Sequence, residues 1–417
     1  MEGGLMNVEA RPIGTERHIP ARIEQLGGLR RIGPIEVSRD LTYEPEGAAI
    51  GLHETLSDDP TSTGRLVRFL ANGEDFGVKT WLDQGHGFLQ FSMPWQRLWS
   101  LAAECQKAQE GQRDWSEGSR THLGLVGVRR MGEGRVEVSD ASTIDGGAVD
   151  PGLLMRWLPS ETNLPTILVN DPERFVRLVP RAIMAIADNE VVLSPEEGLR
   201  LGGAEGIRFW IDKGNLGALR TDFDPAARRF ASEFWESFSG FIDRFAPVLN
   251  QRALAGNIVW GNGDTKPYNM FEVDGRVGII DPITLLLKTG SRGEYTLAPW
   301  PFRDRISELA YFTCYFRAGE RLVGSADRFV YDRAIATYEQ LHGEAVSEGP
   351  GRALLSFHEA ALSQVEFEVN LRLSRDPGCR DSAMRQELAW ALEEEALEAI
   401  GDAHVQASDS GLANVAL

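Results

Sequence analysis

The sequence predicts an α+β protein with a β-rich first part and a mostly helical second part. Short apolar runs typical of strands are concentrated between residues 46 and 158. From about Asp171 onward, apolar residues recur at three- and four-residue steps, which is the period of a helix face. A chain of 417 residues is long enough for two or more domains. We therefore expect a lead-in segment at residues 1–45, a β-rich domain at 46–158 and a helical domain at 159–417.

Strand signals in the first part include one clear hairpin. Arg65–Leu70 and Phe76–Trp81 flank Asn72-Gly73, and this pair favours a two-residue turn because both turn positions require positive φ. A helix is expected after Ser92, with Pro94 near its first turn. Further strands are expected at Ala48–Leu52, Leu123–Arg129, Arg135–Val138 and Leu153–Leu158.

Helix signals in the second part begin where an acid precedes a proline. Asp171-Pro172 predicts an N-cap and a first helical position, and Asp224-Pro225 opens another helix. Pro180 is expected to kink or interrupt the first of these helices. The second helix carries a phenylalanine stripe that predicts a buried core face: Phe230, Phe234, Phe238, Phe241 and Phe245. Other helical patterns fill roughly 304–318, 326–342, 351–375 and 382–400.

Composition and charge restrict the classes of function. The net charge of −19 argues against a general nucleic-acid binder, which would carry a basic stripe. The same acidity suits either a cationic acceptor or simply solubility. The sequence shows no signal-peptide pattern and no apolar run of transmembrane length, so no membrane partner is expected. The three cysteines lie far apart without metal-binding spacing, which favours a reducing, cytoplasmic location.

The stretch Gly261–Pro282 carries the polar residues of greatest chemical interest. Asp264 and Asn269 lie on what is predicted to be a tight loop, and Asp274-Gly275 predicts a hairpin that returns Asp281 close to Asn269. One carboxylate could then accept a hydroxyl proton, while an amide oxygen and a second carboxylate could hold Mg²⁺ on nucleotide phosphates. Asp and Asn are also common turn formers, so the spacing alone is compatible with an ordinary loop.

The order Asp-x-x-x-x-Asn, hairpin, Ile-Asp resembles the catalytic core of the protein-kinase-like superfamily. The nearest resemblance is to the bacterial aminoglycoside-phosphotransferase-like family, whose usual loop is His-Gly-Asp-x-x-x-x-Asn. Gly263-Asp264, Asn269 and Ile280-Asp281 match that pattern, and Asn262 stands where the family usually has His. In the family this His mainly supports the loop, so the departure removes no phosphate or metal contact.

The resemblance covers residues 45–160 loosely and 255–312 more specifically, and it implies a bilobal protein-kinase-like fold. A β-rich N-lobe and a mostly helical C-lobe would enclose ATP or GTP at their hinge. Asp264 would act as the base, while Asn269 and Asp281 would hold Mg²⁺.

A cation on a strand of the first part should bind the nucleotide phosphates in such a fold. Lys79 follows the Asn-Gly hairpin in a Val-Lys context that resembles the family's strand, although a solvent-facing lysine is the alternative. Glu104, among small apolar residues on the following helix, would hold Lys79, and Glu110 is the rival partner.

Three further features would complete the site. Lys266, in Asp-Thr-Lys-Pro-Tyr-Asn, resembles the lysine of protein Ser/Thr kinases and would offset phosphoryl charge, or it is a surface loop lysine. The backbone between Met155 and Leu158 would form the hinge that binds the nucleobase. The phosphate-covering turn should lie within Leu56–Gly64, which has no glycine-rich motif, and Asp304 should cap the next helix and brace the loop.

The leading hypothesis is a phosphotransferase that moves a γ-phosphate to a hydroxyl of a small molecule or of a peptide Ser/Thr. A Ser/Thr kinase of a ribosomal precursor peptide, working with a lyase partner, is the first alternative. A kinase-like pseudoenzyme that serves as a binding or scaffold module is the second, supported by Asn262 and the missing glycine motif.

Overall fold

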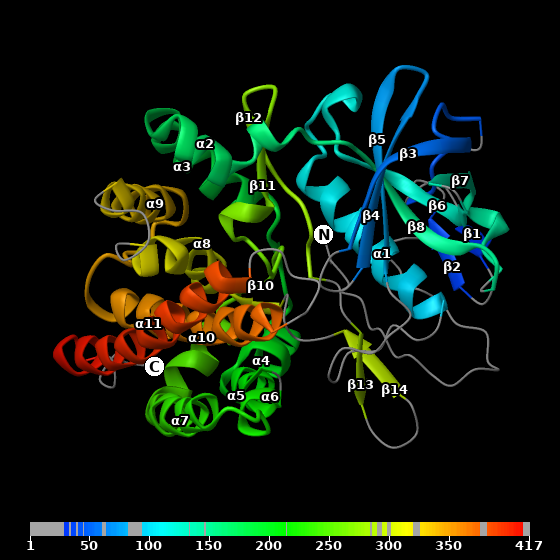
Figure 1. Cartoon of the computed structure of the whole chain (residues 1–417). Coiled ribbons are helices and arrows are strands. Elements are labelled where there is room, and N and C mark those ends of the chain that lie inside the picture. Colours follow the sequence, from blue (N-terminus) through cyan, green and yellow to red (C-terminus); the bar gives the residue numbers. More distant parts are fainter. Residues whose placement is uncertain are drawn as a thin grey trace. The chain divides into compact units, whose positions relative to one another are not determined.

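The computed structural model divides into two compact units (Figure 1). The first comprises the described residues up to Pro159 and those within 282–298, and the second comprises Ser160–Asp281 and the described residues after 298. The structure describes residues 29–32, 35–38, 41–44, 46–60, 64–81, 94–132, 134–145, 147–213, 215–283, 286–289, 294–297, 302–319, 326–375 and 382–411.

The first unit is built on a closed six-stranded barrel in the order β3-β4-β5-β8-β6-β7, which the sequence did not predict. The barrel closes because β3 changes partner along its length: its first half pairs with β7, and its second half pairs with β4 on the other edge. The strands are β3 (Gly51–Pro60), β4 (Gly64–Ala71), β5 (Glu74–Trp81), β6 (His122–Met131), β7 (Arg135–Asp140) and β8 (Asp150–Arg156).

The predicted Asn72-Gly73 hairpin is confirmed. Asn72 and Gly73 have φ of 52° and 82°, and they join β4 to β5 directly after the paired residues Ala71 and Glu74. The helix α1 (Pro94–Gly111) packs against β6 and β8. A second hairpin in this unit joins β13 (Leu286–Thr289) to β14 (Glu294–Leu297).

The segment assigned to a lead-in contributes structure to the first unit. β1 (Leu29–Ile32) and β2 (Ile35–Ser38) form an antiparallel pair. Leu41 is fully buried, and the backbone N–H of Tyr43 donates to the carbonyl of Leu125 on β6 at 3.0 Å. Residues just before the barrel therefore pack on one of its strands.

The second unit is mostly helical, as the sequence predicted. Its helices are α2 (Leu164–Asn170), α3 (Pro172–Asp188), α4 (Pro195–Gly202), α5 (Ala204–Lys213), α6 (Asn215–Arg220), α7 (Pro225–Leu254), α8 (Arg305–Gly319), α9 (Ala326–His342), α10 (Gly349–Ser374) and α11 (Ser382–Asp409). Its strands are β9 (Val191–Val192), β10 (Ile258–Trp260), β11 (Met270–Val273), β12 (Arg276–Ile279) and β15 (Phe302–Asp304), of which β15, β10 and β9 form one sheet. Short 3-10 turns lie at Glu117–Ser119, Ala141–Thr143, Ser160–Thr162 and Pro267–Asn269. None of the described helices combines the length and hydrophobicity that a bilayer-spanning segment needs.

The helix starts follow the capping signals. Asp171 accepts a hydrogen bond from the N–H of Arg174 at the start of α3, and Asp224 accepts one from Ala226 at the start of α7. The expected interruption at Pro180 is absent, because α3 continues through it to Asp188. The helix buries apolar side chains both before and after this proline, which favours one continuous element.

The phenylalanine stripe of α7 forms the centre of the second unit, as predicted. All five side chains are at most 1% exposed. Phe357 of α10 stacks on both Phe238 and Phe241, with ring centroids 4.6 Å apart in each pair. Stacked aromatic rings of this size contribute a large share of the apolar area that a core buries.

Replacing Phe238 by alanine should therefore lower the free energy of unfolding by about 3–5 kcal/mol, because it removes a ring from a filled core. The same change at Phe329, which is 73% exposed on α9, should alter it by less than about 0.5 kcal/mol. Urea unfolding of both variants measures the difference, and equal losses would contradict this assignment of the core.

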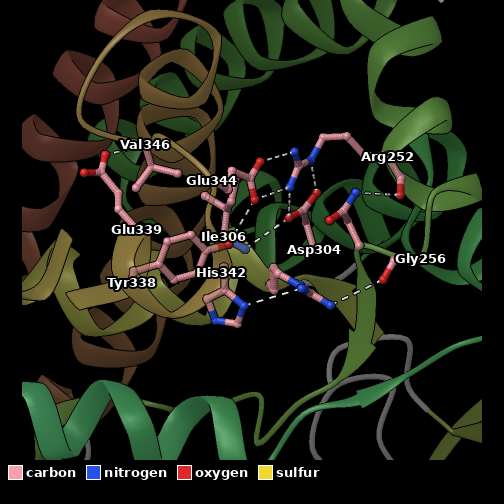
Figure 2. A network of polar contacts seen from close by, with 11 residues as sticks. Arg252, Gly256, Asp304, Ile306, Tyr338, Glu339, His342, Glu344 and Val346 are labelled. Atoms are coloured by element: carbon pink, nitrogen blue, oxygen red, sulfur yellow. Dashed lines mark hydrogen bonds and ion pairs between the residues drawn. The ribbon is translucent and has the colours of Figure 1, made fainter. Parts of the chain in front are cut away.

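A buried polar network ties three segments of the second unit together (Figure 2). Arg252, near the end of α7, donates to both carboxylate oxygens of Asp304 and to both of Glu344. Asp304 also accepts from the N–H of Ile306 at 3.0 Å, which confirms it as the cap of α8. The hydroxyl of Tyr338 donates to Glu344 at 3.3 Å. The hydrogen bonds of the Asp304 carboxylate thus join it to α7 and to the start of its own helix, and among the described residues none joins it to the loop at Asp264.

A buried imidazole beside this network makes stability depend on pH. Burial lowers the pKa of His358 to about 4, although Asp304 favours the charged ring. As the pH falls, the unfolded chain, whose His pKa is near 6.5, binds a proton before the folded chain does. The contribution of the neutral His358 ring to stability is therefore present above about pH 6.5 and is lost as the pH falls toward 4.

His358→Gln should make stability less dependent on pH. In the parent protein, His358 should account for a fall of about 2 kcal/mol in the free energy of unfolding between pH 7 and pH 5. The variant should lack this part of the fall. Denaturant unfolding at the two pH values measures it, and identical pH dependence in both proteins would show that His358 is not buried as a neutral ring.

Candidate functional site

The segment after β10 folds back on itself through the predicted hairpin. Asp274 and Gly275 have φ of 49° and 75°, and they join β11 to β12 in the two-residue turn that an Asp-Gly pair favours. At the open end of the hairpin, the N–H of Ile280 donates to the carbonyl of Asn269 at 2.9 Å. This bond returns the next residue, Asp281, to the neighbourhood of Asn269.

Asp281 has a backbone conformation that is uncommon outside glycine. Its φ of 54° lies in the left-handed region, which Asp adopts more readily than most other residues, as Asp274 does in the hairpin turn.

Asn269 is oriented by the loop that precedes it. It is 7% exposed, and its amide nitrogen donates to the carbonyl of Asp264 at 3.0 Å. The amide oxygen is therefore the atom of Asn269 left to bind a ligand. The backbone bond between Ile280 and Asn269 keeps Asp281 near this amide, and an amide oxygen with a carboxylate is the kind of hard donor set that Mg²⁺ prefers, so the residue types present fit this ion. No cluster of three or more His, Cys, Asp or Glu that could hold a metal is found among the described residues.

Asp264 presents one paired and one unpaired carboxylate oxygen. Its Oδ2 lies 3.1 Å from Nζ of Lys266. Its Oδ1 is buried and has no hydrogen-bond partner in the part of the chain that the structure describes. Burial raises the pKa of Asp264, and the nearby Glu366 raises it further, while Lys266 acts in the opposite direction.

Lys266 lies between two acids. Its Nζ is 3.1 Å from Asp264 Oδ2 and 3.7 Å from Oε1 of Glu366 on α10. Burial disfavours the charged amine, but the two carboxylates more than offset this and raise the pKa of Lys266 above its usual value. The lysine therefore remains a cation beside Asp264 at physiological pH.

Asn262 supports the loop from the position where the resembling family usually has His. It is 1% exposed, and its side-chain oxygen accepts from the backbone N–H of Asp264 at 3.2 Å. A short polar side chain thus fixes the backbone of Asp264.

Two side chains that the sequence did not single out brace the same loop. Glu308 of α8 accepts from the N–H of Gly263 at 3.1 Å through its carboxylate and from the hydroxyl of Thr265 at 2.7 Å through its carbonyl. Arg303 donates to the carbonyl of Gly263. A Cβ at Gly261 would lie 2.4 Å from the carboxyl carbon of Glu308, so a larger residue there would displace this carboxylate from the loop.

Glu366 is the other residue that sequence reasoning missed. The signal was a row of polar residues at three- and four-residue steps along one face of α10, at Glu359, Ser363, Glu366 and Asn370. Each of them is at most 3% exposed. A buried polar row of this kind requires partners on the facing helix.

Lys79 and Glu104 lie in the first unit. Val78 points into the barrel core, so the alternation along β5 places Lys79 on the outer face, where α1 packs. Lys79 Nζ lies 2.8 and 2.9 Å from the two carboxylate oxygens of Glu104, which is fully buried. The rival acid, Glu110, instead accepts from Gln106 at 3.0 Å.

The expected nucleobase hinge and phosphate-covering turn are only partly described. Met155 is half-buried on β8 and pairs with Gly77 of β5, and Leu158 follows the end of β8. Leu56–Pro60 is the end of β3, while residues 61–63 of the expected turn lie outside the described residues.

No family model matches the chain, and no curated protein matches it.

Several solved structures are similar to it at low identity. A thermostable mutant of aminoglycoside phosphotransferase APH(4)-Ia, in a ternary complex with AMP-PNP and hygromycin B, is 11% identical, with 82% of this chain and 94% of that chain covered and a TM-score of 0.42. Spectinomycin phosphotransferase APH(9)-Ia, in complex with ADP and spectinomycin, is 11% identical, with coverages of 88% and 96% and a TM-score of 0.42. Ethanolamine kinase from Plasmodium vivax is 10% identical, with coverages of 82% and 82% and a TM-score of 0.45.

Glu104→Ala should destabilise the first unit by about 3–5 kcal/mol, because it leaves the charge of Lys79 buried without its carboxylate. The double variant Lys79→Met with Glu104→Leu should recover most of this loss, since apolar residues of similar volume need no partner. Glu110→Ala on the same helix is the control and should cost less than about 1 kcal/mol. Urea unfolding measures all three, and a double variant as unstable as Glu104→Ala would contradict the pairing argument.

Proposed function

We propose that this protein is a phosphotransferase that moves the γ-phosphate of ATP or GTP to a hydroxyl group. One observation carries the proposal. Asp264 offers a buried carboxylate oxygen without a partner, beside the charged Lys266, in a loop that also brings Asn269 and Asp281 together. A base, a cation and a pair of hard oxygen ligands are the parts that phosphoryl transfer requires.

Asp264 serves as the base in this proposal. Its Oδ1 accepts the proton of the acceptor hydroxyl as the hydroxyl oxygen bonds to the γ-phosphorus. The bond from that phosphorus to the bridging oxygen breaks, and the nucleoside diphosphate leaves with the electron pair. Because burial raises the pKa of Asp264, its carboxylate is a stronger proton acceptor than an exposed aspartate.

The neighbouring groups bind and neutralise the phosphates. Lys266 stabilises negative charge on the transferring group. Asn269 and Asp281 would hold Mg²⁺, which when bound neutralises phosphate charge. Lys79, fixed by Glu104, would bind the remaining phosphates, and the backbone between Met155 and Leu158 would hold the nucleobase.

These assignments follow the residues that resemble the aminoglycoside-phosphotransferase-like family of the protein-kinase-like superfamily. We accordingly propose a bilobal arrangement in which the barrel-containing unit supplies nucleotide contacts and the helical unit supplies the base. The hydrogen bond from Asp264 to Asn262 supports activity over a scaffold role, because Asn262 keeps the loop in place despite the missing His.

A hydroxylated small molecule is the proposed acceptor, and the surroundings of Asp264 suit a neutral or cationic one. Asp264, Asp281 and Glu366 provide three acids near Lys266, and the charges of Lys266 and Arg303 offset them only in part. A peptide Ser/Thr is the second candidate acceptor, favoured by the protein-kinase-like position of Lys266 two residues after the base. A lyase partner would be expected only in that second case.

Asp264→Asn should lower phosphate transfer by about 10²–10⁴-fold, because the amide cannot take up the hydroxyl proton. Binding of Mg-ATP should change little, since the replacement has the same shape and contacts no nucleotide phosphate in this proposal. Transfer from γ-labelled ATP to a panel of amino sugars, amino alcohols and Ser/Thr peptides measures activity, and a thermal-shift titration measures nucleotide binding.

Asp274→Asn is the matched control for this experiment. It makes the same chemical change in the hairpin turn of the same segment, and Asn-Gly favours that turn as well as Asp-Gly does. It should therefore retain activity. Undiminished transfer by Asp264→Asn would rule out Asp264 as the base.

A further inference from the structure

The carboxylate of Glu366 is buried beside the catalytic loop and is held by the facing helix. Glu366 is 3% exposed, and a buried charge of this kind is stable only with several partners. Tyr311 donates its hydroxyl to Oε1, and Tyr315, one turn later on α8, donates to Oε2. Asn370 donates to the main-chain carbonyl of Glu366 at 2.8 Å and lies 3.5 Å from Oε2. Both oxygens are therefore fixed in position.

This fixed carboxylate shares Lys266 with the proposed base. Nζ of Lys266 lies 3.1 Å from Asp264 Oδ2 and 3.7 Å from Glu366 Oε1. An ammonium group drawn toward Glu366 is held on the Oδ2 side of Asp264. The other oxygen of Asp264, Oδ1, is the one without a hydrogen-bond partner among the described residues.

We propose that Glu366, clamped by Tyr311 and Tyr315, is a positioning residue that holds Lys266 on one oxygen of Asp264 and so keeps the other oxygen open for the acceptor hydroxyl. This inference rests on the proposed phosphotransferase function. Without Glu366, its attraction for the ammonium group of Lys266 would no longer oppose the attraction that Asp264 exerts on the same group. Lys266 could then bridge both carboxylate oxygens and occupy the place of the hydroxyl.

Glu366→Gln is the first test because glutamine keeps the shape of the side chain and can still bond to both tyrosines. It should lower kcat about 10- to 100-fold while leaving the KM for ATP within about twofold, since the nucleotide does not contact Glu366. In a Lys266→Met background the same substitution should lower kcat much less, because only the direct effect of the Glu366 charge on the pKa of Asp264 then remains. A residue that acts mainly through another shows this lack of additivity, whereas a general loss of structure would lower kcat equally in both backgrounds.

Glu359→Gln is the matched control. Glu359 is a fully buried glutamate on the same face of α10, two turns earlier, and its carboxylate accepts from Thr313 and Tyr331, each at 2.8 Å. The same isosteric change there should alter kcat by less than about twofold in either background. This control separates the loss of a buried carboxylate in general from the loss of the one beside Lys266.

A second readout is independent of catalysis. Reductive methylation of lysine amines with formaldehyde, followed by mass spectrometry of the peptide that contains Lys266, reports how firmly its ammonium group is held. Labelling of Lys266 in the full chain should be several-fold faster in Glu366→Gln and in Tyr315→Phe than in the parent protein. It should be unchanged in Glu359→Gln. Tyr315→Phe keeps the ring and so provides the test if Glu366→Gln does not fold.

The two readouts distinguish failure of the inference from failure of the proposed function. Faster labelling with no phosphate transfer to any acceptor would support the positioning of Lys266 by Glu366 and reject the phosphotransferase assignment. Unchanged labelling in both variants, or an equal loss of kcat in the Lys266→Met background, would overturn the positioning role even in an active enzyme.

Discussion

Buried charge that must be paired is the constraint on which this structure depends. Transferring a carboxylate or an ammonium group from water to a protein interior is costly unless an opposite charge and hydrogen bonds accompany it. Lys79 with Glu104 in the first unit, and Arg252 with Asp304 and Glu344 in the second, satisfy this condition with close contacts. Each pairing fixes side chains from elements that are far apart in the sequence.

The loop at Asp264 satisfies the same constraint only in part. Its charges are only partly paired, which leaves a polar atom available to a ligand. Glu308 and Arg303 hold the loop backbone, while Lys266 and Glu366 balance part of the charge of Asp264. One oxygen of Asp264 is left without a partner among the described residues. A buried unpaired acceptor is expensive to maintain, so its presence beside a lysine points to a ligand that supplies the missing donor.

Much of the fold and part of the site could be predicted because their signals are local. The Asn72-Gly73 and Asp274-Gly275 turns, the Asp171 and Asp224 caps and the α7 phenylalanine stripe each depend on a few neighbouring residues, and all are confirmed. The helix α4 was missed even though Ser194 and Glu197 have the Ser-x-x-Glu spacing of a helix start, and Ser194 does accept from the N–H of Glu197 there.

The rest depends on contacts between distant segments, which one sequence does not reveal. Barrel closure requires β3 to pair with β7, and the pairing partner of a strand edge is not encoded locally. Glu366 reaches Lys266 across a separation of one hundred residues, and Glu308 reaches Gly263 across forty-five. The continuity of α3 through Pro180 likewise follows from tertiary burial rather than from local preference.

In the proposed function, the segment from Asp264 to Asp281 would bind the phosphates of a nucleotide next to an acceptor hydroxyl. A crystal structure of the full chain with Mg²⁺ and a non-hydrolysable ATP analogue tests it most directly. We expect the ion on the amide oxygen of Asn269 and the carboxylate of Asp281, Lys79 on the phosphates, and the γ-phosphate beside Asp264. A nucleotide bound elsewhere, or an ion held by other residues, would contradict it.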